Sequence, residues 1–371
     1  MILIVLLIAA AAVLIWERLM RRALAEAVEV TLDADASEIN AGEELGFTET
    51  VVNRGVMPVP VMEIRFRIGK GLRFMNAENI TESDYLYKRD VFSLLSHEQI
   101  TREYRVLGEK RGFYQVSGAD ISMRAVPSFN EYVRALDADL SFYVYARRVP
   151  VRDILAAIET PLGQLAAANR LYEDPFSFAQ IREYQQTDPM KTINWKASAK
   201  TGQLMVNTYT SVRSEQIAVY LDLEERRIVK TPDRTEECIS VAASLMEILL
   251  TKNLESALVI GIRDSAHGDH PQPFVFGPGR GSTLLKELEQ FLTGDFAEAG
   301  TVPMDVMLSH FPPGGRVPVI ITKNADSEMM RSIEAALPGG QNAIVVAVSG
   351  DGEMLPAAGG QIRLMRRKVT V

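Results

Sequence analysis

Short apolar runs alternate with segments of helical periodicity throughout the C-terminal part of the chain. The apolar runs occupy residues 217–221, 258–262, 317–321 and 343–348, and the helical segments occupy residues 235–251, 282–292 and 327–337. Strands buried on both faces are apolar throughout, and helices between such strands cover a parallel sheet. The alternation predicts a Rossmann-like α/β domain with a parallel sheet over residues 201–371, in which ligands bind beyond the carboxyl ends of the strands.

The preceding part of the chain, residues 26–149, has the alternation that is typical of β-strands. Segments such as residues 28–32 and 63–68 alternate apolar and polar side chains, and turn signals such as residues 53–55 separate them. Strands at this spacing, without a convincing long helix, predict an antiparallel β-sandwich. Because no catalytic constellation stands out in it, we expect this domain to be a scaffold.

The N-terminus begins with 16 uncharged residues, and a glutamate and three arginines follow by residue 22. Such a run can cross a bilayer when charged side chains at its end snorkel to the surface. We therefore expect a transmembrane anchor over residues 1–22, and an α+β multidomain chain overall. The arginines after the run predict a single-pass protein of the cell membrane with cytoplasmic domains. A signal peptide cleaved at residues 23–25 is the alternative.

Composition excludes several functional classes. The formal net charge of −8 leaves no basic surplus to neutralise phosphates, so no nucleic-acid partner is expected. Cys238 is the only cysteine, which excludes an internal disulfide and a multi-cysteine metal site. We expect Cys238 to be a small buried apolar residue, and we expect no cofactor.

Residues 150–200 are expected to form a helical connector, and they contain the most informative stretch of the chain. Its notable residues are Arg182, Tyr184, Asp188, Asn194, Trp195, Lys196 and Ser198. Asp188 is a suitable N-cap, and Gly202 a suitable C-terminal stop, for a short helix that carries Trp195 and Lys196.

This stretch resembles the signature of the bacterial family catalogued as domain of unknown function 58. Members typically combine an Arg-x-Tyr, an aspartate a few residues on, and an Ile-Asn/His-Trp-Lys-x-Ser-Ala-Arg/Lys run. The specific match extends from Ile181 to Asp222. The wider layout, which includes a Lys-Arg-Gly-x-Tyr segment at residues 110–114, agrees over most of the chain.

The resemblance implies a C-terminal domain similar to the von Willebrand factor type A fold and a MoxR-type AAA+ ATPase as partner. It also implies an association with transglutaminase-like membrane proteins, and no enzymatic activity. The expected function is that of a membrane-anchored, non-enzymatic adaptor or chaperone-like protein in the assembly of cell-envelope or other protein complexes. A passive membrane scaffold for a transglutaminase-like partner, or a metal-dependent hydrolase, are the alternatives.

The chain departs from the type A pattern where that fold holds Mg²⁺. In place of Asp-x-Ser-x-Ser, the first predicted strand is followed by Asp222, Glu224 and Arg226. The type A fold has a further aspartate after its fourth strand, but here Lys323 and Asn324 occur beyond the apolar run at residues 317–321. A guanidinium at this point would oppose a divalent cation. We therefore expect a degenerate site without metal, with Asp222 hydrogen-bonded to nearby backbone.

Two loops offer weaker candidates for a site. The only cluster of histidines and carboxylates consists of Asp264, His267, Asp269 and His270. A metal site would need these ligands to converge on a rigid frame, and a polar loop explains them more simply. Residues 277–283 look like a phosphate loop but lack its Lys-Ser/Thr ending, so Ser282 or Thr283 is expected to cap the next helix.

The signature itself admits two interpretations. Trp195, Lys196 and Arg182 could form a docking surface, because Trp and Arg dominate interface energetics. Alternatively, Trp195 packs the connector against the sheet domain, while Arg182 and Asp188 form a structural ion pair.

Overall fold

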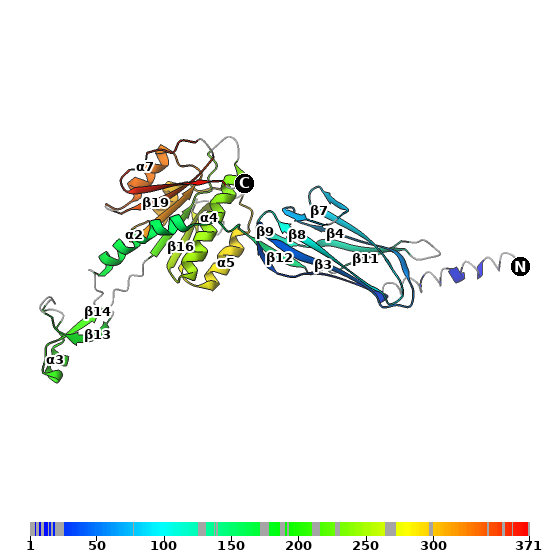
Figure 1. The fold of residues 1–371 in the computed structure, drawn as a ribbon, viewed down its shortest axis with the longest axis horizontal. Helices are drawn as coiled ribbons and strands as arrows, with labels where there is room; N and C mark the ends of the chain where they lie inside the picture. Colours follow the sequence, from blue (N-terminus) through cyan, green and yellow to red (C-terminus); the bar gives the residue numbers. More distant parts are fainter. Residues whose placement is uncertain are drawn as a thin grey trace. The chain divides into compact units, whose positions relative to one another are not determined.

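The computed structural model divides the chain into two compact units (Figure 1). One unit comprises Met1–Arg148 with Glu289–Asp295, and the other comprises Val149–Leu288 with Phe296–Val371. The structure describes scattered positions before residue 26, and then residues 26–369 except 77, 125–130, 137, 139, 171–177, 186–189, 191–192, 210–215, 227–230, 264–271, 297–299, 340, 351–352 and 358.

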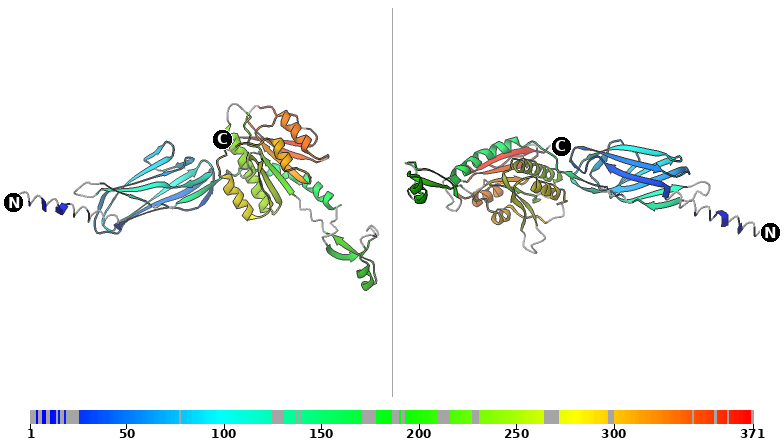
Figure 2. Two further views of the ribbon diagram at one scale, coloured as in Figure 1. Left: turned by 180° about the vertical axis from the view of Figure 1, so that it is seen from behind. Right: turned by 90° about the horizontal axis from the view of Figure 1, so that it is seen from below.

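The first unit consists mainly of β-strands (Figures 1 and 2). They are β1 (Val28–Ala34), β2 (Glu38–Asn40), β3 (Glu44–Asn53), β4 (Val59–Ile68), β5 (Leu72–Phe74), β6 (Ile80–Glu82), β7 (Leu86–Leu94), β8 (Gln99–Gly108), β9 (Gly112–Gln115), β10 (Ser117–Arg124), β11 (Glu131–Ala135) and β12 (Ser141–Tyr145). Their sheets have the orders β1-β3-β8-β5, β11-β10-β4-β7-β6 and β2-β12-β9.

The two larger sheets of this unit are antiparallel and share one hydrophobic core. Every second residue of β3 and of β7 is buried, which matches the two-residue period of a strand with one face on a core. Phe47 of β3 stacks on Phe66 of β4 with ring centroids 5.7 Å apart, so the core joins the two sheets. Burial of such rings is a main source of stability for a sheet pair.

The rest of the chain alternates helices and strands. Its elements are α2 (Arg152–Arg170), β13 (Phe178–Glu183), α3 (Trp195–Thr201), β14 (Met205–Tyr209), β15 (Gln216–Leu221), α4 (Pro232–Thr251), β16 (Glu255–Arg263), β17 (Pro273–Gly279), α5 (Ser282–Leu292), α6 (Met304–His310), β18 (Arg316–Thr322), α7 (Ser327–Ala336), β19 (Ala343–Ser349) and β20 (Ile362–Lys368). β13 and β14 form a separate antiparallel pair.

Six of these strands form one mixed sheet in the order β17-β16-β15-β18-β19-β20. β15, β16, β18, β19 and β20 are parallel to one another, and β17 pairs antiparallel with β16 at one edge. Ala218 and Tyr220 belong to the core beneath α6 and α7, whereas Ile217 and Val219 are buried on the opposite face. Helices therefore cover both faces of the sheet, which explains why its central strands are apolar throughout.

The structure corrects the expected fold class and location at the N-terminus. Among the described residues, no helix is long and apolar enough to cross a membrane. Most of residues 1–22 lie outside the described residues. A helix that crosses a hydrocarbon core of about 30 Å needs about 20 predominantly apolar residues. The predictions of a transmembrane helix and of a single-pass protein of the cell membrane were therefore wrong.

The C-terminal sheet and the connector segment also differ from the sequence prediction. The sheet expected to be parallel is mixed, and the segment expected to be a helical connector contains β13 after α2. The fold is thus rich in strands, with several antiparallel sheets and one mixed sheet. The helix of the signature begins at Trp195 with Asn194 as its N-cap, and Asp188 lies outside the described residues.

Candidate functional site

Asp222 lies directly after β15, at the carboxyl edge of the mixed sheet, and is fully buried. Its Oδ1 accepts a hydrogen bond of 3.0 Å from the backbone N–H of Glu224. Its Oδ2 accepts bonds of 2.6 Å from the hydroxyl of Thr322 and 3.1 Å from the side-chain amide of Asn324. Burial raises the pKa of Asp222, and these three hydrogen bonds oppose that rise.

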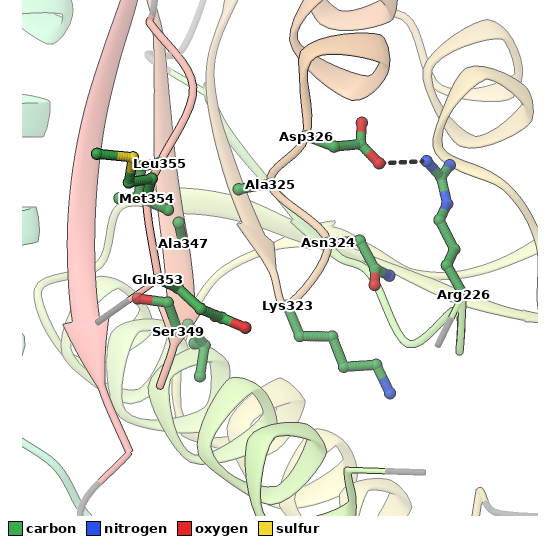
Figure 3. A pocket seen from close by; sticks show the side chains of 11 residues that line it. Arg226, Lys323, Asn324, Ala325, Asp326, Ala347, Ser349, Glu353, Met354 and Leu355 are labelled. Carbon is green, nitrogen blue, oxygen red and sulfur yellow. Dashed lines mark hydrogen bonds and ion pairs between the residues drawn. The ribbon is translucent and has the colours of Figure 1, made fainter. Parts of the chain in front are cut away.

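Arg226 lies next to Asp326 at this edge, and its side chain is 30% exposed (Figure 3). Its guanidinium donates 2.7 Å to Glu224 and 3.3 Å to Asp326. We call Asp222, Glu224, Arg226, Thr322, Asn324 and Asp326 the strand-end cluster. The cluster thus carries an arginine paired with two carboxylates.

Lys323 forms a second ion pair next to this cluster. Its side chain is 3% exposed, and Nζ lies 2.8 Å from both Glu225 Oε2 and the hydroxyl of Thr235. The buried ammonium is tolerated because a carboxylate and a hydroxyl accept hydrogen bonds from it.

The strand-end cluster does not have the donor arrangement of a magnesium site. Both oxygens of the Asp222 carboxylate accept hydrogen bonds from protein groups, and Arg226 supplies a positive charge next to them. In the described part of the chain, no three His, Cys, Asp or Glu residues are placed to hold a metal ion. The hydrogen-bonding groups of Thr322 and Asn324 therefore stabilise the buried Asp222 in place of a cation.

A polar cavity of about 350 Å³ opens at the same edge of the sheet. Arg226, Lys323 and Asn324 line one side of it, and Ser349 and Glu353 line another (Figure 3). Ser349 is 3% exposed, and its hydroxyl has no hydrogen-bond partner in the described structure. The cavity can accommodate a small polar group, at the position where open α/β sheets bind ligands.

The signature residues fall into two groups, and the first group builds local structure. Asn194 caps α3, because its side chain accepts a 2.9 Å hydrogen bond from the N–H of Ala197. The hydroxyl of Ser198 donates 2.8 Å to the carbonyl of Asn194 and accepts 2.8 Å from the N–H of Met205. Gly202 ends the helix at a φ of 76°, which confirms the predicted stop. Asn194 and Ser198 thus fix α3 to the start of β14.

The second group of signature residues is at the surface. The side chain of Trp195 is 67% exposed, and Lys196 is also exposed. Ile181, Met190 and Leu204 are large apolar residues that are at least 40% exposed. The signature segment thus exposes one large aromatic and several large aliphatic side chains.

Arg182 and Tyr184 occupy the strand that pairs with β14 and the residue just beyond it. The guanidinium of Arg182 donates 3.0 Å to the carbonyl of Glu183. The backbone N–H of Tyr184 donates 2.8 Å to the carbonyl of Leu204. The predicted ion pair between Arg182 and Asp188 involves a residue outside the described part of the chain.

The structure also shows where Cys238 and the segment that resembles a phosphate loop lie. Cys238 is fully buried in α4, as predicted, and burial raises the pKa of its thiol. Residues 277–279 belong to the edge strand β17, and Ser282 begins α5. The loop with Asp264, His267, Asp269 and His270 lies outside the described residues.

Sequence reasoning missed Thr322 and Ser349 as parts of the site. Both are the last residues of strands in the sheet, so each reaches the carboxyl edge where Asp222 lies. Their position after an apolar run was a usable signal, because parallel strands end at one edge.

Comparison with known proteins agrees with the signature. Residues 180–288 match the model of a family described as protein of unknown function DUF58. The uncharacterized protein YeaD of Bacillus subtilis (strain 168) is 22% identical over 326 residues, which cover 80% of this chain and 76% of that protein.

Two similar solved structures each cover about a third of the chain. The CARDB domain of a Pyrococcus furiosus protein, in complex with di-metal ions, is 16% identical with a TM-score of 0.22 and covers 32% of this chain and 89% of that one. A non-cellulosomal cohesin from Archaeoglobus fulgidus is 10% identical with a TM-score of 0.23 and covers 35% of this chain and 97% of that one. The family match and the relative from Bacillus subtilis together support the assignment of residues 180–288 to the DUF58 family.

Proposed function

We propose that the protein is a non-enzymatic adaptor that binds a MoxR-type AAA+ ATPase through the signature helix α3. The observation that carries the proposal is the 67% exposure of Trp195 in the most distinctive segment of the sequence. Asn194 and Ser198 account for the local structure, whereas Trp195 and Lys196 are left at the surface. A large exposed aromatic side chain on a capped helix is typical of a residue that dominates an interface.

The mixed sheet supports the likeness to the von Willebrand factor type A fold that the signature implies. Its strands run in the order 3-2-1-4-5-6 when numbered from β15, with one antiparallel edge strand. We infer an adaptor domain of this type in which the hydrogen-bonded Asp222 replaces a metal centre. Interaction surfaces, and not catalysis, are then the functional parts of the domain.

The adaptor function is tested by measuring binding between the purified full-length protein and the purified ATPase. The measurement is repeated without nucleotide, with ADP, with ATP and with a non-hydrolysable ATP analogue. We expect binding in at least one nucleotide state, and we expect Trp195→Ala to weaken it about 30-fold, which is the effect of about 2 kcal/mol at a hot spot.

Leu95→Ala is the matched control, because Leu95 is 68% exposed but lies in the first unit, far from the signature in sequence. Its affinity should equal that of the unmodified protein. An absence of binding in every nucleotide state would refute the adaptor proposal. Equal affinities of Trp195→Ala and the unmodified protein would refute the role of α3.

A further inference from the structure

Three ionisable side chains are buried in the core of the first unit. Lys88 and Asp90 lie two residues apart on β7 and therefore face the same side, toward the core. Glu49 lies on β3 in the other large sheet. Their exposed fractions are 2%, 4% and 0%. Burial of ions costs several kcal/mol each unless they are well paired, so this group of residues requires an explanation.

Both carboxylates and two aromatic rings surround the amine of Lys88. Its Nζ contacts Oδ2 of Asp90 directly and lies 3.8 Å from Oε2 of Glu49. It also lies 3.8 Å from the ring centroid of Tyr104 and 5.7 Å from that of Phe66. The amine is thus held against a carboxyl group in an environment that excludes water.

The protonation states favour a nucleophilic amine. Burial lowers the pKa of Lys88 to about 8, because the ammonium loses its hydration. Burial raises the pKa of Glu49 for the same reason. Oε1 of Glu49 also has no hydrogen-bond partner in the described structure. A larger share of the Lys88 amine is therefore neutral at neutral pH, and the Glu49 carboxylate accepts a proton more readily than an exposed one.

Arg102 provides a fixed positive charge at the same carboxyl group. Its NH1 lies 3.4 Å from Oδ1 of Asp90. Two contacts hold the guanidinium in place: NH2 donates 2.9 Å to the carbonyl of Val91, and Cζ lies 4.0 Å from the ring centroid of Phe92. A charge held in this way stabilises negative charge that develops on Oδ1 during attack at Cγ.

We propose that Lys88 and Asp90 become joined by an intramolecular isopeptide bond, with Glu49 carrying the proton. Lys88 first passes one proton to the Asp90 carboxylate that its Nζ contacts. The neutral amine then attacks Cγ of the resulting carboxyl group, and a bond forms between Nζ and Cγ. Glu49 takes the proton that the nitrogen loses and delivers it to the leaving oxygen. The bond between Cγ and that oxygen breaks, and one water molecule is released. No atom is oxidised or reduced.

Two physical effects favour the amide. Nucleophile and electrophile are already in contact, so the reaction is unimolecular and avoids the entropic cost of bringing two groups together. The product also replaces a buried ammonium and carboxylate with a neutral amide, which removes the desolvation cost of both charges. In water this reaction is disfavoured because hydration stabilises the separated ions, and burial removes that hydration.

Mass spectrometry of the full-length protein tests the bond. We expect the intact mass to be lower than the sequence mass by one water molecule. In a tryptic digest, we expect no cleavage after Lys88. Cleavage after Arg89 should leave two peptides joined through the side chains of Lys88 and Asp90.

Substitutions identify the side chains that form the isopeptide bond. Lys88→Arg keeps the charge but cannot form this bond, so it should have the full sequence mass, and Glu49→Gln should slow or abolish the loss of water. Lys70→Arg, at an exposed position, is the control and should lose water as the unmodified protein does.

The unmodified protein alone decides the result, whether or not Lys88→Arg folds. A mass equal to that of the sequence would overturn the proposal. So would loss of water at another position, or a cross-link from Lys88 to the peptide that contains Glu49.

Discussion

The side-chain amide of Asn324 donates a hydrogen bond of 3.1 Å to the carboxylate of Asp222, across the ends of two neighbouring parallel strands. The same amide donates 2.7 Å to the carbonyl of Glu224, so it fixes the loop that follows β15. The hydroxyl of Thr322 completes the arrangement at 2.6 Å. Neutral donors thus satisfy a buried carboxylate that would otherwise need a cation.

Replacement of Asp222 by alanine should destabilise the second unit by about 2–4 kcal/mol, because the donors of Glu224, Thr322 and Asn324 would remain buried without an acceptor. Urea denaturation followed by circular dichroism measures this difference. Asp305→Ala, at an exposed position of α6, should change the free energy of unfolding by about 0.5 kcal/mol or less. Equal stabilities of the two variants would contradict the role of Asp222.

The pH dependence of stability should report the burial of Asp222. Burial raises the pKa of Asp222 above its ordinary value of 3.8, so the folded protein retains a proton that the unfolded chain has released. Between the ordinary pKa and the folded pKa, the unfolded state binds fewer protons, and the contribution of Asp222 to stability falls as pH rises. Asp222→Asn cannot titrate.

The comparison is therefore between the unmodified protein and Asp222→Asn over a pH series that starts near the ordinary pKa of aspartate. The stability of the unmodified protein relative to the variant should decrease as pH rises from about 4. A difference that stays constant, or that increases with pH, would show that the pKa of Asp222 is not raised in the folded state.

Elements whose hydrophobic pattern matches their own geometry were predictable from the sequence. α4 (Pro232–Thr251) and β18 (Arg316–Thr322) lie where the patterns placed them, because both are buried and their sequences are apolar at the required spacing. The edge strands β17 and β20 were not predicted. β20 carries arginines and a lysine in place of an apolar run, and β17 contains three residues that read as a turn.

The candidate site was predictable only in part, because only some of its residues have a signal in their local sequence. Asp222 follows an apolar run, so its place at the edge of the sheet was evident. Its partners Thr322 and Asn324 lie 100 and 102 residues away, and only the order of the strands brings them together. The membrane anchor was predicted from the apolar character of residues 1–22, but no helix among the described residues is long and apolar enough to span a membrane.

Magnesium should not bind at the strand-end cluster. The guanidinium of Arg226 lies within hydrogen-bonding distance of Glu224 and Asp326, and the oxygens of Asp222 are occupied. Isothermal titration calorimetry with MgCl₂ compares the unmodified protein with Asp222→Ala. The substitution should remove no binding event, because none should occur at the cluster. The melting temperature with and without MgCl₂ is a second measure. Mg²⁺ bound at 100 times its dissociation constant would add about 2.7 kcal/mol of stability, so an unchanged melting temperature would show that it does not bind.

Cys238 should be unreactive in the folded protein. It is fully buried in α4, and burial raises the pKa of its thiol, so the reactive thiolate is both scarce and inaccessible. Labelling with a maleimide, followed by intact mass measurement, should show no adduct under native conditions and one adduct in urea. Rapid labelling of the folded protein would show that α4 opens, or that the thiol is exposed.

Two glycines should respond to alanine in opposite directions. Gly202 ends α3 at a φ of 76°, a conformation that strains any residue with a Cβ, although nothing lies within 4 Å of the added atom. Gly163 lies exposed within α2, where alanine favours the helix by about 0.5–1 kcal/mol.

Hydrogen–deuterium exchange, read separately for the peptides that cover each helix, distinguishes the two effects. Gly202→Ala should accelerate exchange in residues 195–201 by about fivefold, which corresponds to about 1 kcal/mol. Gly163→Ala should slow exchange in α2. If Gly202→Ala protected α3 instead, the left-handed cap would not exist in solution, and the position of Trp195 at the start of a fixed helix would have to be abandoned.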